Sequence, residues 1–275
     1  MTLLSLAKSA WMMVLVLSFG FLDPVEASTS HLLKTPRGIL LRVELEIPAK
    51  PARDYPILIV APGQSCNSKS QLFEILSRDA LIAGFTVLRF DWAYCAVHPQ
   101  NPVPSAFLAN EIEDMETVLK FAKEFAMSNG FARPNQIKLV GKSQGSFVAY
   151  KLFQRHPDLR ALALLTPVCT YTRDGQNRPM QVPVSVGAQN YPGLKTQNRP
   201  VLFISGSSDE FCLSSSLSEL VDGAGPLVST LLVNGDHSLR IVAPDGAVDS
   251  AATTANIEHA VRSLLNWLES GVSTR

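Results

Sequence analysis

The stretch that decides the fold is Ile137-Lys138-Leu139-Val140-Gly141-Lys142-Ser143-Gln144-Gly145-Ser146, in which a short apolar run ends in a serine between two glycines. The apolar run is typical of a buried strand, and the residues from 143 to 156 predict a helix that stops before a proline. A strand that turns sharply into a helix at G-x-S-x-G is the setting of a nucleophile elbow, in which a strained turn lifts the serine hydroxyl out of the sheet. The sequence therefore predicts that Ser143 is a nucleophile at the carboxyl end of a strand.

Two other interpretations compete with the elbow. A glycine-serine turn can occur in any strand-to-helix crossover. The tripeptide Gly141-Lys142-Ser143 also ends like a phosphate loop, but that motif requires a glycine five residues before Gly141, where this chain has Gln136. The missing glycine argues against nucleotide binding.

Strand and helix patterns alternate along the rest of the chain. Apolar or β-branched runs typical of strands lie at 39–47, 56–61, 86–90, 137–140, 161–165, 201–204 and 230–233. Helical patterns lie at 68–83, 108–126, 143–156 and 257–268. This alternation predicts an α/β fold with a doubly wound, mostly parallel sheet, and the Arg/Glu alternation in 39–47 predicts an antiparallel edge strand.

The segment 169–200 breaks this alternation. It contains four prolines, little periodicity and many polar residues, which predicts a long connection over the C-terminal end of the sheet. Such a connection is either functional or a surface excursion. Because no repeat and no Gly/Ser linker divides the chain, we expect a single domain over residues 28–275.

The first 27 residues are predicted to be a secretory signal peptide. Lys8 ends a weakly basic head, residues 10–22 are mostly apolar, and Val25 and Ala27 supply small residues at the −3 and −1 positions of a cleavage site. A membrane anchor is the alternative, but a span needs roughly 20 apolar residues and this run is shorter. We expect a secreted or periplasmic protein without a stable membrane anchor after cleavage.

The chain has four cysteines, Cys66, Cys95, Cys169 and Cys212, an even number that an exported protein can oxidise. None of their spacings resembles CxxC, which argues against a zinc site. Each cysteine follows a predicted strand at the carboxyl edge of the sheet, and neighbouring loops favour the pairs Cys66–Cys95 and Cys169–Cys212. Free buried or loop thiols are the alternative.

The composition limits the classes of partner. With 46% hydrophobic and 17% charged residues, the 275-residue chain is too apolar for wholesale disorder. Its 24 basic and 24 acidic side chains give no net charge, so there is no basic footprint for nucleic acid and no polybasic membrane tag.

A serine nucleophile needs a base within hydrogen-bond reach and an acid that orients the base. After an elbow of this kind the acid is expected next along the chain, and the histidine last. Asp209 follows the predicted strand 201–204, and His237 follows the predicted strand 230–233. Both are therefore expected at the same sheet edge as Ser143.

Other residues compete for these two roles. His98, in a loop after Asp91-Trp92, is the main alternative base, whereas His31, His156 and His259 are better explained by the surface or by packing. Glu210 and Asp236 are alternative acids. Asp236 directly precedes His237 and would have difficulty folding back to its Nδ1.

Acyl transfer also needs hydrogen-bond donors for the oxyanion. The backbone N–H of Gln144, immediately after the nucleophile, is one predicted donor. The strand 56–61 ends in Pro62-Gly63-Gln64, where the glycine permits a tight loop, so the N–H of Gln64 is the predicted second donor. A simple strand-to-helix turn is the alternative.

Together these motifs resemble the α/β-hydrolase superfamily over essentially the whole mature chain. The resemblance implies Ser143 as nucleophile, Asp209 as acid, His237 as base, and N–H groups near Gln64 and Gln144 as the oxyanion hole. The modest insertion at 169–200, where many relatives carry a large lid, looks most like the small dienelactone-hydrolase-like branch. Dienelactone hydrolases proper use a cysteine nucleophile, so their substrate is not carried over, and the HGGG signature of many lipases is absent.

The resulting hypothesis is an exported, cofactor-free serine hydrolase. It would cleave a small-molecule ester, thioester or amide through an acyl-enzyme on Ser143. A binding protein that kept the fold without its chemistry is one alternative, and an exported serine peptidase is another.

Overall fold

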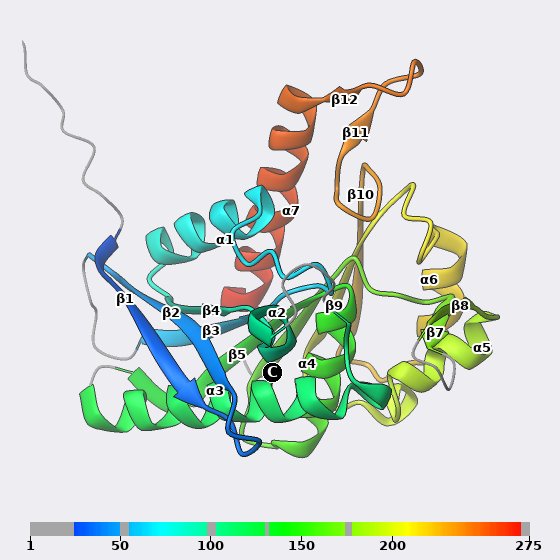
Figure 1. The fold of residues 1–275 in the computed structure, drawn as a ribbon. Helices are drawn as coiled ribbons and strands as arrows, with labels where there is room; N and C mark the ends of the chain where they lie inside the picture. The colour runs from blue at the N-terminus through cyan, green and yellow to red at the C-terminus, as the bar shows by residue number, and fades with distance from the viewer. Residues whose placement is uncertain (1–24, 50–54, 98–102, 130–131, 174–177, 271–275) are drawn as a thin grey trace, which may run out of the picture.

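The computed structural model describes residues 25–49, 55–97, 103–129, 132–173 and 178–270. Within these residues an eight-stranded sheet has the order β1-β2-β4-β3-β5-β6-β9-β10 (Figure 1). Its strands are β1 (Val25–Lys34), β2 (Leu40–Pro48), β3 (Tyr55–Ala61), β4 (Thr86–Phe90), β5 (Ala132–Lys142), β6 (Ala161–Leu165), β9 (Val201–Gly206) and β10 (Val228–Val233). The neighbouring strands in the part of this order that runs β4-β3-β5-β6-β9-β10 pair in parallel. Strand β2 pairs antiparallel with both β1 and β4. The predicted α/β fold is confirmed.

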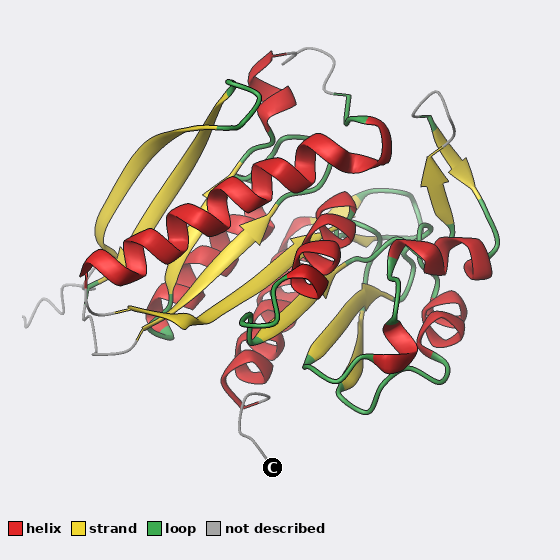
Figure 2. Ribbon diagram, turned by 90° about the horizontal axis from the view of Figure 1, so that it is seen from below, coloured by secondary structure: helices red, strands yellow, loops and turns green. Residues whose placement is uncertain are grey.

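Helices cover both faces of this sheet (Figure 2). The helices α3 (Ala109–Asn129) and α4 (Gln144–Arg155) share one apolar cluster with one face, and α1 (Gln71–Ile82) and α7 (Ser250–Ser270) share a second cluster with the other. Strands β4, β6 and β9 are buried along their whole length, and their sequences are accordingly mostly apolar; in β4 the charged exception is Arg89, which pairs with Glu46. Burial of each leucine or valine side chain stabilises the fold by roughly 1.5–3 kcal/mol. The two clusters therefore hold the helices against the sheet, and the loops that form the site emerge from a stable edge.

The position of β2 corrects one prediction. The run 39–47 forms an antiparallel strand, but it is not at the edge, because β1 pairs along its outer side from Val25 opposite Pro48 to Lys34 opposite Leu40. The polar, weakly alternating sequence of β1 carries little strand signal. The predicted cleavage site after Ala27 falls inside β1, and residues 1–24 of the predicted signal peptide lie outside the described residues.

The segment 169–200 lies beside the carboxyl ends of β6 and β9, as expected, but contains more regular structure than predicted (Figure 1). It forms the hairpin strands β7 (Tyr171–Arg173) and β8 (Pro179–Gln181), the helix α5 (Val184–Gly187) and the 3-10 turns η2 (Ala188–Asn190) and η3 (Leu194–Thr196). These elements are too short to show a hydrophobic period. Tyr191, which is buried, fastens the segment by hydrogen bonds to Ser146 and to the backbone N–H of Val168.

The remaining elements are short, and α6 (Ser214–Val221) is the longest of them. The others are α2 (Ala93–Val97), η1 (Ala106–Leu108) and the hairpin strands β11 (Ile241–Val242) and β12 (Val248–Asp249). In the part of the chain that the structure describes, no helix has the length and apolar character needed to cross a bilayer.

Candidate active site

Ser143 occupies the turn between β5 and α4 in a strained conformation. Its φ is 52° and its ψ is −120°, a region that non-glycine residues rarely adopt. The flanking glycines are required by close approach: a Cβ on Gly141 would lie 2.5 Å from the carbonyl oxygen of Gly145, and a Cβ on Gly145 would lie 2.4 Å from that of Pro62. The G-x-S-x-G pattern therefore reflects steric exclusion at both glycine positions.

His237 and Asp209 lie next to Ser143 in the order that the sequence predicts. The Nε2 atom of His237 is 2.8 Å from Oγ of Ser143, and its Nδ1 atom is 2.9 and 3.0 Å from the two carboxylate oxygens of Asp209. Because an ionised carboxylate can only accept, Nδ1 carries the proton and Nε2 is left to accept from the serine hydroxyl. The arrangement can move a proton from Ser143 to His237.

The acid is held rigidly. Asp209 is fully buried and also accepts a hydrogen bond of 2.9 Å from the backbone N–H of Phe211. The ring of Phe211 packs on the His237 ring, with centroids 4.5 Å apart. Phe211 thus holds both the carboxylate and the imidazole in place, a role that the sequence did not indicate.

The competing acids and bases that the structure describes are engaged elsewhere or exposed. Asp236 accepts hydrogen bonds from the backbone N–H groups of Ser238 and Arg240 and pairs with the Arg240 guanidinium, so its carboxylate is committed to its own turn. Glu210 is exposed. His156 pairs with Glu116, which leaves it outside the site. His98, the main alternative base, lies outside the described residues.

The loop after β3 passes close to Ser143. A Cβ on Gly63 would lie 3.5 Å from Cβ and 4.0 Å from Oγ of Ser143, so only a small residue leaves room for a reacting group there. The indole N–H of Trp92 donates to the carbonyl oxygen of Gly63 at 3.1 Å. In a trans peptide the next N–H, that of Gln64, points in the opposite direction from this carbonyl, away from Trp92.

Two more contacts fasten this loop. The Tyr94 hydroxyl donates to the carbonyl oxygen of Gln64 at 2.9 Å, and Cys66 forms a disulfide with Cys95, with Cα atoms 5.7 Å apart. The side chain of Gln144 donates to the Tyr94 hydroxyl at 3.3 Å, and its backbone begins α4. The sequence predicted Gln64 and Gln144 as backbone donors but gave no indication that α2 and Trp92 position the loop.

A second disulfide supports the acid side of the site. Cys169 and Cys212 are paired, with Cα atoms 4.7 Å apart, and both are buried. The backbone N–H groups of Cys169 and Thr170 donate to the carbonyl oxygen of Phe211, which ties the loops after β6 and β9 together. Both pairings that the sequence favoured are formed, and two disulfides fit an oxidising compartment.

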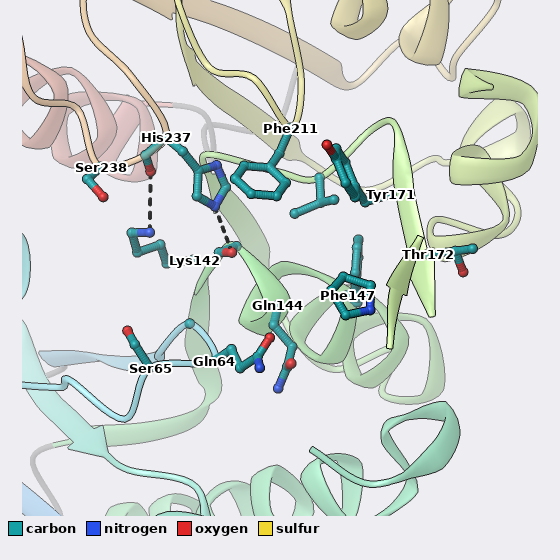
Figure 3. Close-up of a pocket in the computed structure, with 14 residues that line it drawn as sticks. Gln64, Ser65, Lys142, Gln144, Phe147, Tyr171, Thr172, Phe211, His237 and Ser238 are labelled. Atoms are coloured by element: carbon teal, nitrogen blue, oxygen red, sulfur yellow. Dashed lines mark hydrogen bonds between the residues drawn. The ribbon is translucent and has the colours of Figure 1, made fainter. Parts of the chain in front are cut away.

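A cavity of about 280 Å³ opens beside Ser143 and His237 (Figure 3). Its apolar wall consists of Phe147, Val168, Tyr171, Pro179 and Phe211. Tyr171 and Pro179 belong to the β7–β8 hairpin, so the segment 169–200 contributes directly to the site. Figure 3 shows Gln64 and Gln144 on the side of the cavity opposite Phe211.

The site brings together a serine, a histidine and a carboxylate that are joined by hydrogen bonds. Within the described ranges, no group of three or more His, Cys, Asp or Glu side chains is arranged so that it could hold a metal ion. All the predicted catalytic residues, by contrast, meet at a single sheet edge.

Comparison with known proteins places this geometry in a family. A family model described as an alpha/beta hydrolase domain matches residues 54–269. No curated protein sequence matches the chain. The family match spans every residue discussed for the site.

Solved structures show the same fold at low sequence identity. An esterase domain from Rhodothermus marinus is 18% identical with a TM-score of 0.60, covering 88% of this chain and 97% of its own. A candidate dienelactone hydrolase from Klebsiella pneumoniae is 14% identical with a TM-score of 0.64, covering 89% and 98%. A serine hydrolase without a lid from Xanthomonas campestris is 17% identical with a TM-score of 0.57, covering 90% and 94%.

Proposed function

Because the chain belongs to the alpha/beta hydrolase family, we propose that it is a serine hydrolase that cleaves a small-molecule ester, thioester or amide through an acyl-enzyme on Ser143. The observation that carries this proposal is the continuous hydrogen-bond chain from Asp209 through His237 to the Ser143 hydroxyl. The strained backbone at Ser143 supports it, since such strain concentrates at functional sites.

In the first half of the reaction, Oγ of Ser143 attacks the substrate carbonyl while Nε2 of His237 takes the hydroxyl proton. The buried carboxylate of Asp209 stabilises the imidazolium that forms. Collapse of the tetrahedral intermediate breaks the bond to the leaving group, which receives the proton from His237. Water then attacks the acyl-enzyme with His237 again as base, and free Ser143 is regenerated.

The developing oxyanion is stabilised by backbone donors. The N–H of Gln144 lies in the first turn of α4, where the helix dipole favours negative charge. The N–H of Gln64 is turned away from Trp92 by the hydrogen bond on the Gly63 carbonyl. A donor of this kind contributes about 3–4 kcal/mol to the transition state.

The size and lining of the cavity favour a small substrate. At about 280 Å³, the cavity lies near the lower limit of ligand pockets, and its apolar wall suits a short acyl or alkyl group. Export through the predicted signal peptide, to the cell exterior or the periplasm, is part of the same proposal and is supported by the two disulfides.

Turnover of short p-nitrophenyl esters by the purified protein tests the proposal. Ser143→Ala and His237→Ala should each lower kcat by several orders of magnitude, because the two residues act as a unit. Asp209→Ala should lower it somewhat less. Ser128→Ala, an exposed serine at the end of α3, is the matched control and should retain wild-type kcat.

Two results would contradict the proposal. Wild-type activity in Ser143→Ala would assign the chemistry to another residue. A folded wild type that turns over no ester, thioester or amide would instead support a binding protein that kept the fold.

A further inference from the structure

A second cavity of about 230 Å³ adjoins the catalytic cavity. The two share Gly63, Ser65, Lys142 and Ser238 among their lining residues. The other polar side chains around the second cavity are Asn67, Ser70, Gln71, Arg240 and Thr253. The second cavity is thus more polar than the first, although Leu72, Phe73 and Ile257 also line it, and Lys142 lies where the two cavities meet.

Lys142 brings to this junction a positive charge that has no direct ion-pair partner in the described chain. Its ammonium donates to the carbonyl oxygen of His237 at 3.4 Å, and among the described residues no carboxylate lies within ion-pair distance of it. Figure 3 shows its side chain between Ser238 and Ser65, on the side of the cavity opposite Tyr171. Burial lowers the pKa of Lys142, although the negative charges of Asp209, Asp236 and Glu210 oppose this effect.

The rest of the second cavity does not supply the missing anion. Arg240 is already paired with Asp236 at 2.7 Å. No aspartate or glutamate of the described chain lines either cavity. The first turn of α1 also lines this cavity; the Ser70 side chain does not cap it, and Glu74 of the same turn pairs with Arg89. An anion that enters from solvent would therefore meet the Lys142 ammonium with no carboxylate of the described residues lining either cavity, although the charges of Asp209, Asp236 and Glu210 oppose its approach.

We propose that the substrate carries a carboxylate on one side of its scissile carbonyl, and that Lys142 binds this carboxylate at the junction of the two cavities. This inference rests on the proposed hydrolase function. The apolar part of the substrate lies against Phe147 and Phe211, and the carboxylate lies toward the second cavity. A monoanion fits better than a dianion, because Asp209, Asp236 and Glu210 already add negative charge around the one ammonium.

The geometry also limits the length of the substrate. The Lys142 ammonium contacts the backbone of His237, and the ring of the same histidine contacts Ser143. A bound carboxylate would therefore lie within about one residue's width of the reacting carbonyl. A short spacer, as in the half-esters of small dicarboxylic acids, satisfies this distance.

Two pairs of esters, each an acid and its methyl ester, test the inference. Mono-4-nitrophenyl glutarate against its methyl ester places the charge in the acyl group, and 4-acetoxybenzoate against its methyl ester places it in the leaving group. The readout is the ratio of kcat/KM for the acid to that for the neutral ester, corrected for spontaneous hydrolysis. In the wild type, one charge-assisted hydrogen bond should raise this ratio about tenfold in one of the two pairs. The pair that responds identifies the side that carries the charge.

Variants at position 142 then test whether Lys142 causes the preference for the acid over the neutral ester. Lys142→Met should lower the ratio about tenfold and Lys142→Arg should preserve most of it, because Arg keeps the charge. Lys120→Met, an exposed lysine on α3, is the matched control and should leave the ratio at the wild-type value. If Lys142→Met does not fold, the wild-type ratio itself should fall as salt rises, since ions screen the attraction.

A wild-type ratio at or below one in both pairs, or an unchanged ratio in a folded Lys142→Met protein, would overturn the inference. Either result leaves the proposed function intact as long as the neutral esters are hydrolysed and the activity depends on Ser143. Failure of the proposed function looks different: neither member of either pair would be hydrolysed.

Discussion

The two disulfides fasten opposite sides of the same site, but they do so in different surroundings. Cys169 and Cys212 are fully buried, under the loop that carries Asp209, and Ser205 adds a hydrogen bond to the Cys212 carbonyl. Cys66 and Cys95 are partly exposed and hold the Gly63-Gln64 loop from outside. The loop that carries Asp209 is therefore part of the core. The Gly63-Gln64 loop lies at the surface and is held by one disulfide and by hydrogen bonds from Trp92 and Tyr94. We expect damage to the first to appear as lost stability, and damage to the second as lost turnover.

Replacing the buried disulfide should have the largest effect. The chain-entropy model gives similar contributions for the two bridges, about 4 kcal/mol for the 43-residue separation and about 3.5 kcal/mol for the 29-residue one. Cys169→Ala/Cys212→Ala should lose more than this, because it also leaves a cavity in the core. Urea unfolding of this variant and of Cys66→Ala/Cys95→Ala measures the difference. Equal losses would show that burial does not distinguish the bridges.

Mild reduction should separate the two regions without mutation. A thiolate reductant reaches the partly exposed Cys66–Cys95 bridge before the buried one. Ester turnover should then fall severalfold while near-UV circular dichroism stays native. Alkylation and peptide mapping at each time point identify the bridge that has opened. Loss of activity that follows the Cys169–Cys212 bridge instead would break the comparison.

Two Tyr→Phe substitutions sharpen the contrast. Tyr94→Phe removes the donor to the Gln64 carbonyl and should lower kcat about fivefold, for one hydrogen bond of about 1 kcal/mol, with little change in Tm. Tyr191→Phe strands the buried N–H of Val168 and should lower stability by about 1–3 kcal/mol. Thermal melts and ester kinetics on both proteins measure these effects. A loss of stability in Tyr94→Phe together with a loss of turnover alone in Tyr191→Phe would contradict the distinction between the two regions.

A pH dependence of stability should also appear, and it belongs to neither region. Burial lowers the pKa of Lys138, whose ammonium donates to the Leu268 carbonyl, to about 8. Between about pH 8 and its unfolded value the unfolded chain binds more protons, so stability should rise with pH. Lys138→Met should reduce this rise, as unfolding at pH 7.5 and pH 10 would show. Both disulfide variants should retain it, and its loss in either would mean that the regions are coupled.

The sequence predicted most of the fold because strands buried on both faces leave short runs that are mostly apolar. The predicted strands 86–90 and 161–165 coincide with β4 and β6. It placed β2 at the edge because β1 is polar and its start overlaps the predicted cleavage site. The β7–β8 hairpin escaped notice because three-residue strands have no visible period.

In the site, the sequence was informative where chemistry restricts the residue type. The order Ser143, Asp209 and His237 could be predicted because each follows a strand at one sheet edge. The residues that position them could not, because Phe211, Trp92 and Tyr94 act through packing and contacts with backbone atoms that only the folded chain brings together. Lys142 was visible as a charge next to the nucleophile, but only the two cavities show where that charge lies.

The central claim is that His237 and Asp209 activate Ser143 as a nucleophile. Reaction of the intact protein with a fluorophosphonate, followed by mass spectrometry of its peptides, tests this most directly. The account predicts one adduct per chain, on Ser143, which is absent from Ser143→Ala and forms orders of magnitude more slowly in His237→Ala. No adduct on the folded wild type, or an adduct on another residue, would contradict it.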